Sequence, residues 1–341
     1  PLGNHCDVIR MLKVFKWTIN EDQLIYVDDR SVHEYSYPAQ HEFEWQRTTR
    51  DMHVEGDHPH VSIDDRVFVE TVGGDLTIKV ENNTLKASCD SLHGTDFTFP
   101  KNSHTGTETL IMAATLATGT TTLRNAALEP EIDDLIEFLN KMGADIKREP
   151  SRVIKINGVN NLKPVIHQVM PDRNEAVSYA IAGVVTKGDI IIENANKNHL
   201  DIFLEKLKLA GVGVEIDKYG IRVYYQENLK AVDITTKPHP GFMTDWAPLW
   251  SVLATQLNGP SKIVETIMSS RFQFAKDLKS MGAKIDFFDP KPKDPEKFYN
   301  FNLEDDDPSN FHGMTVTGPT PLKAMNAKVT DIRAGATLAL A

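Results

Sequence analysis

The chain has few cysteines, no long apolar run and no excess of positive charge. Cys6 and Cys89 are its two cysteines, and no CxxC pair occurs, which argues against a disulfide framework or a cysteine-rich zinc site. No apolar run approaches the roughly 20 residues that span a bilayer, and no signal peptide opens the sequence. The net charge of −11 argues against a general nucleic-acid binder. We therefore expect a cytoplasmic protein that binds neither nucleic acid nor membrane.

The length of 341 residues predicts two domains, each able to bury its own core. Both ends of the sequence look cut. The first residue is Pro1 rather than Met, and the final ATLALA stops inside a pattern that is typical of an apolar helix. We expect a fragment or a trimmed chain.

Two sets of glycines repeat with one period. The intervals are 69 and 71 residues in the first set, and 68 and 71 in the second. The first set is Gly119, Gly188 and Gly259; the second is Gly143, Gly211 and Gly282, with Gly73 lying 70 residues before Gly143. Two markers with one period of about 70 indicate a duplicated supersecondary unit. We expect each glycine to end a helix.

One copy shows the pattern of the unit. Residues 104–117 are mostly apolar and predict a buried helix, and the β-branched residues 120–126 predict a strand. Pro130 and the flanking acids predict the start of a second helix, and residues 144–149 a further strand. Helical spacing predicts the buried faces of the second helices: Ile132, Leu135, Ile136, Leu139 and Met142; Leu200, Phe203, Leu204 and Leu207; Phe274, Leu278 and Met281.

This pattern predicts an α/β (α+β) protein of about six βαβαββ units, the outer two incomplete. Six units most simply form two lobes of three, residues 1–170 and 171–341, with a cleft between them and a crossing at 163–172. Residues 30–62 break the pattern, and residues 288–310 read as an insertion of solvated loops in the second lobe.

Five ordered motifs resemble the UDP-N-acetylglucosamine enolpyruvyl transferases, within a superfamily that includes 5-enolpyruvylshikimate-3-phosphate synthase. The resemblance covers residues 70–285 and 320–341. The motifs are KNSHTG…GADI (101–146), PDRNE (171–175), HPGFMTD (239–245), ETIMSSRFQF (265–274) and TDIRAGATLALA (330–341). The resemblance implies a two-lobed, inside-out α/β barrel.

It also implies the reaction. Enolpyruvyl would pass from phosphoenolpyruvate to the 3-hydroxyl of UDP-N-acetylglucosamine through a tetrahedral intermediate, the first committed step of peptidoglycan synthesis. The partners are then these small-molecule substrates, and no cofactor is implied. The histidines at 33, 41, 53, 58 and 60 lack the spacing and accompanying acids of a metal site, so we expect no metal.

Lys101, Asn102, Ser103 and His104 directly precede the apolar helix. The N–H groups at a helix start suit an anion, and Lys101 adds positive charge. The resemblance assigns this turn to the uridine diphosphate; the alternative is a plain N-cap by Ser103.

Asp245 lies at the start of another helix. The resemblance makes it the group that orients the sugar 3-hydroxyl and takes its proton. The alternative is an acid that merely complements the helix dipole.

Several further residues face the cleft by resemblance. Guanidinium binds phosphate or carboxylate with two donors at once; the alternative is an Arg–Asp pair that holds one lobe together. The residues are Arg271, Asp331 and Arg333, with Ile267 contacting substrate through its backbone and Arg47 and His58 as further candidates. For Asp172 and Arg173 we favour an ion pair at the hinge.

Three family elements are missing from the sequence: an N-terminal Lys-Asn pair, a lid with its proton donor, and a late arginine. We expect weak substrate binding and little turnover by these 341 residues. Two other readings remain open, a non-catalytic paralogue that binds a nucleotide-sugar or a protein, and a transferase of the shikimate branch.

Overall fold

The computed structural model describes most of the chain from residue 92 onward and four short strands before it. The described residues are 24–27, 32–35, 77–81, 84–88, 92–326 and 332–341. The chain divides into two compact units, Pro1–Met170 and Pro171–Ala341. In the first unit, β1 (Leu24–Val27) pairs with β2 (Val32–Tyr35) and β3 (Thr77–Glu81) with β4 (Thr84–Ser88), both antiparallel.

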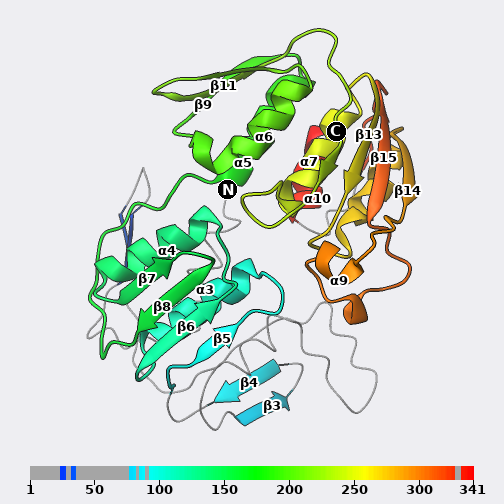
Figure 1. The fold of residues 1–341 in the computed structure, drawn as a ribbon. Coiled ribbons are helices and arrows are strands. Elements are labelled where there is room, and N and C mark those ends of the chain that lie inside the picture. The colour runs from blue at the N-terminus through cyan, green and yellow to red at the C-terminus, as the bar shows by residue number, and fades with distance from the viewer. Residues whose placement is uncertain (1–23, 28–31, 36–76, 82–83, 89–91, 327–331) are drawn as a thin grey trace. The chain divides into compact units, whose positions relative to one another are not determined.

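The rest of the first unit is one complete βαβαββ repeat (Figure 1). It consists of β5 (Asp96–Thr98), α3 (His104–Thr115), β6 (Thr120–Arg124), α4 (Pro130–Lys141), β7 (Asp145–Glu149) and β8 (Val153–Asn157). The sheet order is β5-β6-β8-β7, with β5 parallel to β6 and the other pairs antiparallel. Both helices bury apolar residues against the same sheet core.

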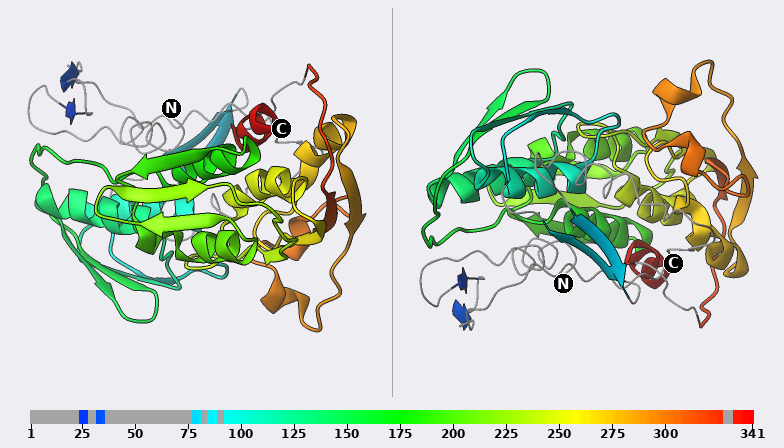
Figure 2. Two further views of the ribbon diagram at one scale, coloured as in Figure 1. Left: turned by 90° about the horizontal axis from the view of Figure 1, so that it is seen from above. Right: turned by 90° about the horizontal axis from the view of Figure 1, so that it is seen from below.

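The second unit begins with a copy whose described part has no first strand. It consists of α5 (Arg173–Val185), β9 (Asp189–Glu193), α6 (Lys197–Leu209), β10 (Gly213–Ile216) and β11 (Gly220–Tyr224). The three strands form an antiparallel sheet in the order β10-β11-β9. Helices α5 and α6 lie side by side on one face of this sheet (Figure 2).

A second complete repeat follows. It consists of β12 (Ile234–Thr235), η1 (Thr244–Trp246), α7 (Ala247–Ala254), β13 (Gly259–Val264), η2 (Arg271–Phe274), α8 (Ala275–Ser280), β14 (Lys284–Phe288) and β15 (Gly313–Gly318). The order β12-β13-β15-β14 has the same topology as the sheet of the first unit. The duplication expected from the glycine period is therefore present.

The connection between β14 and β15 contains α9 (Pro295–Phe298) and η3 (Leu303–Asp305), and α10 (Ile332–Leu340) follows β15. Most side chains of 288–297 and 304–310 are exposed or half-buried, as expected of loops. Between the two stretches, however, Tyr299 and Phe301 are buried and contact the ring of His312.

The second set of glycines ends helices as expected. Gly143, Gly211 and Gly282 have φ of 104°, 88° and 110°, the left-handed conformation that glycine adopts without strain. At Gly143 the glycine N–H donates to Asn140 O, and the N–H of Ala144 donates to Leu139 O. The same pair of bonds recurs at the other two glycines, so all three helices end in a Schellman motif.

The expectation was wrong for the first set. Helix α3 ends at Thr115, and Gly119 instead lies directly before β6 with φ of 96°. The chain leaves α3 early because Thr118 forms a bridge with His93 before the strand begins. Gly259 likewise opens β13, and in the middle copy Lys187, rather than Gly188, has the positive φ.

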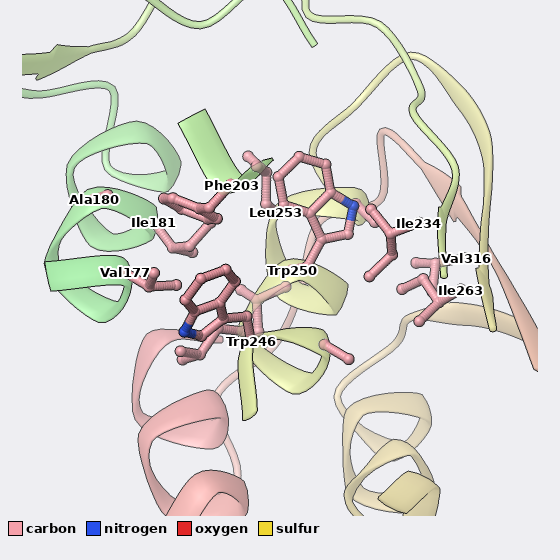
Figure 3. Packing of buried hydrophobic residues seen from close by; sticks show 14 of the residues in the cluster. Val177, Ala180, Ile181, Phe203, Ile234, Trp246, Trp250, Leu253, Ile263 and Val316 are labelled. Carbon is pink, nitrogen blue, oxygen red and sulfur yellow. The ribbon is translucent and has the colours of Figure 1, made fainter. Parts of the chain in front are cut away.

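The core of the second unit is built by helices (Figure 3). Helix α7 contacts both α5 and α10. Its Trp250 and the preceding Trp246 are fully buried. In Figure 3, Val177 and Ile181 of α5 lie on one side of α7, and side chains from β12, β13 and β15 lie on the other.

The fold class was predicted correctly as mixed α/β, and the described part of the chain contains no closed barrel of strands. Each sheet there is open, because its strands pair within one copy of the repeat. The buried helices cover the inner faces, so apolar burial does not require the strands to close on themselves. No helix among the described residues is both long and apolar enough for a membrane span.

Candidate functional site

The candidate residues fall into three groups: one in each unit, and one outside the described residues. Lys101 to His104 lie in the first unit, at the start of α3, and Asp245, Ile267, Arg271 and Arg333 lie in the second unit. Asp331, Arg47 and His58 are outside the described residues, so their assignments stay predictions.

The start of α3 is a capped helix terminus. Ser103 is the N-cap, and its Oγ accepts a hydrogen bond of 3.0 Å from the N–H of Gly106. The preceding turn is tied to the end of β6, because Asn102 Nδ2 donates to Asn125 O and Asn125 Nδ2 donates to Phe99 O. The cap that the sequence suggested is therefore formed, and it leaves Lys101 and His104 flanking the positive end of the helix.

His104 is held close to acids. Its Nε2 lies 3.3 Å from Glu108 Oε1, one turn along α3. Burial lowers the pKa of His104, but hydrogen bonding to Glu108 and the charges of Glu108, Glu129 and Glu131 outweigh it and raise the pKa to about 9. His104 is therefore a cation at neutral pH, and with Lys101 it makes the helix start suitable for an anion.

Asp245 is the central residue of η1, and both of its neighbours are anchored. The indole Nε1 of buried Trp246 donates to Asn174 Oδ1 of α5 at 2.9 Å. Thr244 Oγ1 donates to Glu265 Oε2, also at 2.9 Å. Because the flanking side chains point into the protein, the Asp245 carboxylate lies between two fixed positions and keeps a quarter of its side chain exposed.

Two guanidinium groups converge on Asp245. Arg271, the first residue of η2, places Nη2 3.0 Å from Asp245 Oδ1, and Arg333 of α10 places Nη2 3.6 Å from Oδ2. Arg271 Nε donates to Thr244 Oγ1 at 2.9 Å. The side chain of Arg271 is 8% exposed and that of Arg333 16%. The structure thus brings together three residues from η1, η2 and α10 that are far apart in sequence.

Ile267 lies in the turn after β13. Its backbone N–H donates to Glu265 Oε1 at 2.7 Å. A ligand at this turn would therefore meet the carbonyl side of Ile267 rather than its N–H.

Asp172 and Arg173 at the start of α5 have separate local roles. Asp172 is the N-cap, and its Oδ1 accepts from the N–H of Asn174 at 2.7 Å. Buried Arg173 lies over the ring of Trp246, 5.7 Å from its centroid, with Nη1 3.2 Å from His239 Nδ1. Arg173 therefore adds to the packing around η1, and the ion pair of Asp172 and Arg173 stays a prediction.

Sequence reasoning missed Glu265, which bonds to both Thr244 and Ile267. The sequence did offer one signal: Glu265 directly follows a strand that ends in β-branched residues. A charged side chain in such a buried place is normally paired. Among the residues that the structure describes, no group of three or more His, Cys, Asp or Glu side chains could hold a metal.

Family models match two parts of the chain. The model for EPSP synthase (3-phosphoshikimate 1-carboxyvinyltransferase) matches residues 70–341. A model described as an ATPase involved in DNA repair matches residues 4–91. Arg47 and His58 thus fall in the second match and outside the first.

Curated relatives have similar sequences. A UDP-N-acetylglucosamine 1-carboxyvinyltransferase of Sorangium cellulosum is 39% identical over 266 residues, which are 78% of this chain and 58% of the relative. One from Caldanaerobacter subterraneus is 38% identical over 272 residues, 80% of this chain and 60% of the relative. The chain spans about three fifths of the length of these relatives.

Solved structures agree in fold. The enolpyruvyl transferase NikO from Streptomyces tendae matches with a TM-score of 0.66 at 21% identity, over 82% of this chain and 65% of that one. EPSP synthase from Acinetobacter baumannii matches with a TM-score of 0.53 at 18% identity, over 82% and 63%.

Proposed function

This chain belongs to the EPSP synthase (3-phosphoshikimate 1-carboxyvinyltransferase) family, and from that membership we propose that it acts in enolpyruvyl transfer to UDP-N-acetylglucosamine. The acceptor is taken from the relatives at 36–42% identity, which are named UDP-N-acetylglucosamine 1-carboxyvinyltransferases. The donor in this proposal is phosphoenolpyruvate. In this proposal the reaction belongs to peptidoglycan synthesis and takes place in the cytoplasm.

One observation carries the proposal: the carboxylate assigned to the sugar hydroxyl lies against both arginines assigned to anions. Asp245 contacts Arg271 and Arg333 at 3.0 and 3.6 Å. A nearby carboxylate can take the proton of a hydroxyl, and arginines can bind the carboxyl and phosphate groups of phosphoenolpyruvate. In this structure the carboxylate of Asp245 and the two guanidinium groups are in contact. Such an arrangement suits a reaction between a sugar hydroxyl and phosphoenolpyruvate.

The roles below are part of this proposal. Asp245 accepts the proton of the sugar 3-hydroxyl as the hydroxyl oxygen bonds to C2 of phosphoenolpyruvate. C3 takes a proton from a general acid, the role that the resemblance gives to a lid residue, and the tetrahedral intermediate results. Loss of phosphate and of a C3 proton then gives the enolpyruvyl ether. Arg271 and Arg333 neutralise the anionic groups, and the carbonyl side of Ile267 borders the sugar. For Lys101 and His104, in the other unit, the proposal keeps the role that the resemblance gives them, contact with the diphosphate.

Isothermal titration calorimetry on the purified chain tests substrate binding. We expect UDP-N-acetylglucosamine to bind with a Kd below about 1 mM, and 3-phosphoshikimate to give no heat. Lys101→Ala should weaken binding about tenfold, because a phosphate contact is lost. The matched control is Lys155→Ala, which removes an exposed lysine of β8 in the same unit. Silence toward the UDP-sugar at millimolar concentration contradicts the proposal, and heat from 3-phosphoshikimate alone assigns the chain to the shikimate branch.

A further inference from the structure

Glu265 is a fully buried carboxylate at the end of β13 that touches no proposed substrate group. Its Oε1 accepts three hydrogen bonds: from Thr236 Oγ1 at 2.9 Å, from Ile267 N at 2.7 Å and from Met268 N at 3.0 Å. The last two donors are the backbone of the turn that carries Ile267. One oxygen of Glu265 therefore fixes this turn and joins it to the end of β12.

The other oxygen leads to Asp245 and Arg271. Oε2 accepts from Thr244 Oγ1, and Thr244 Oγ1 accepts from Arg271 Nε, both at 2.9 Å. The hydroxyl has one hydrogen and the guanidinium can only donate, so the direction of the chain is fixed. Arg271 donates to Thr244, and Thr244 donates to Glu265. The same guanidinium donates Nη2 to Asp245 Oδ1 at 3.0 Å.

Four hydrogen-bond donors surround the Glu265 carboxylate, so both of its oxygens must act as acceptors. Burial raises the pKa of Glu265, and the charge of Arg271 together with the hydrogen bonds from Ile267, Met268 and Thr236 opposes that rise. A buried charge is tolerated when it is paired and hydrogen-bonded in this way. A proton on Oε2 would reverse the bond from Thr244 and break the chain toward Arg271.

The main chain around Glu265 is held as well. Its own N–H donates to His312 O at 2.9 Å, and Asn300 N–H donates to Thr266 O at 2.6 Å. His312 and Asn300 both belong to the β14–β15 connection. Because the backbone is fixed on this side, a substitution at 265 acts on the side-chain network before it moves the strand.

We propose that Glu265 is a positioning residue. Through Thr244 it orients the Arg271 guanidinium against Asp245, and through the amides of Ile267 and Met268 it sets the neighbouring turn. This inference rests on the proposed function for its consequence in ligand binding, while the orientation of Arg271 needs no ligand.

Three substitutions separate the parts of the network. Glu265→Gln keeps the volume and places an NH₂ group where Oε1 or Oε2 accepted a bond. Thr244→Val removes the linking hydroxyl and leaves Glu265 in place. Thr244→Ser restores the hydroxyl and is the matched control. The readouts are the Arg271 Nε–H signal in ¹⁵N-arginine NMR spectra, identified by its loss in Arg271→Lys, and the affinity for UDP-N-acetylglucosamine.

We expect Glu265→Gln and Thr244→Val to shift or broaden the Arg271 Nε–H signal and to weaken UDP-sugar binding about tenfold. Thr244→Ser should keep the signal in place and the affinity within about twofold of the unsubstituted chain. A general loss of stability would not produce this pattern, because valine and serine at 244 differ by the hydroxyl that the network uses.

An unmoved Arg271 signal in Glu265→Gln or in Thr244→Val overturns the inference, and so does an equal shift in the valine and serine variants. If Glu265→Gln does not fold, the Thr244 pair decides by itself. If the unsubstituted chain fails to bind the UDP-sugar, the proposed function fails. The NMR comparison then still decides the role of Glu265, since that signal reports the ligand-free protein.

Discussion

The two complete repeats, residues 96–157 and 234–318, share one topology but hold the start of their first helix differently. In the first unit, Ser103 caps α3 through a bond that spans three residues. In the second unit, η1 has no side-chain cap, and its bonds to Asn174 and Glu265 span 72 and 21 residues. The two repeats therefore share a backbone pattern, but the first helix start is held by a bond within the same turn and the second by bonds to residues far away in the sequence.

This difference matches the chemistry that we propose for the two helix starts. A local cap satisfies the backbone and leaves a positive end flanked by Lys101 and His104, which suits an anion. An anchored η1 instead aims one side chain, Asp245, at groups that come from two other elements. Binding of a diphosphate tolerates some movement of the donors, whereas proton removal requires a carboxylate within hydrogen-bond distance of one oxygen.

The largest effect is expected when the negative charge of Asp245 is removed. Asp245→Asn should lower the small rate of phosphate release that we expect of the unsubstituted chain with phosphoenolpyruvate and the UDP-sugar by about 100- to 10,000-fold, because an amide cannot accept the proton. The measurement is a phosphate-release assay on protein with unchanged circular dichroism. Asp277→Asn, which alters an acid in the first turn of α8, is the matched control. Equal rates for Asp245→Asn and the unsubstituted chain would reduce Asp245 to an ion-pair partner of Arg271.

The next largest effect tests the anchor itself. Trp246 is fully buried against Phe203 and Phe242 and bonds to Asn174. Trp246→Ala should lower the free energy of unfolding of the second unit by about 3–5 kcal/mol, since it leaves a cavity and an unpaired amide oxygen. Urea unfolding checks this value. Trp246→Phe keeps an aromatic ring and should lower the free energy of unfolding by less. A loss below about 1 kcal/mol for the alanine variant would show that Trp246 does not anchor η1.

The contrast also explains what could be predicted from the sequence. The second-set glycines and Ser103 act through hydrogen bonds within a few residues, and Pro130 acts through its fixed φ at the first helical position. Their patterns therefore predicted helix ends and starts correctly. The apolar spacing in α4 and α6 predicted their buried faces, because helical geometry alone decides which residues share a face.

Long-range features could not be predicted in this way. Glu265 reads as an ordinary acid after a strand, and its role depends on Thr244 and Arg271, which only the fold brings to it. The convergence of Arg333 and Asp245, 88 positions apart in the sequence, was expected from family resemblance rather than from any local pattern. Gly119 was misassigned because a bridge to His93, distant in sequence, ends α3 before it.

A smaller effect is expected at the local cap. Ser103→Ala should destabilise the start of α3 by about 1 kcal/mol, because the N–H of Gly106 loses its acceptor. Hydrogen exchange of the first turn of α3 measures this, with Ser103→Thr as the control that keeps an acceptor. A change in exchange of α7 in the other unit, or a loss as large as that of Trp246→Ala, would break the distinction between the two helix starts.

The smallest effect is a pH dependence confined to the first unit. The pKa of His104 rises to about 9 in the folded chain from an ordinary value of 6.5, so its contribution to stability is full below about pH 6.5 and is lost as pH rises toward 9. Because the side chain of His104 is 31% exposed and that of Glu108 12%, we expect solvent screening to hold the effect below about 1 kcal/mol. Urea unfolding at several pH values, compared with His104→Gln, isolates the contribution. Glu108→Gln should flatten the same dependence, because it removes the nearest acid. A difference between wild type and His104→Gln that grows with pH would reverse the sign and show that the imidazole is neutral at this helix start.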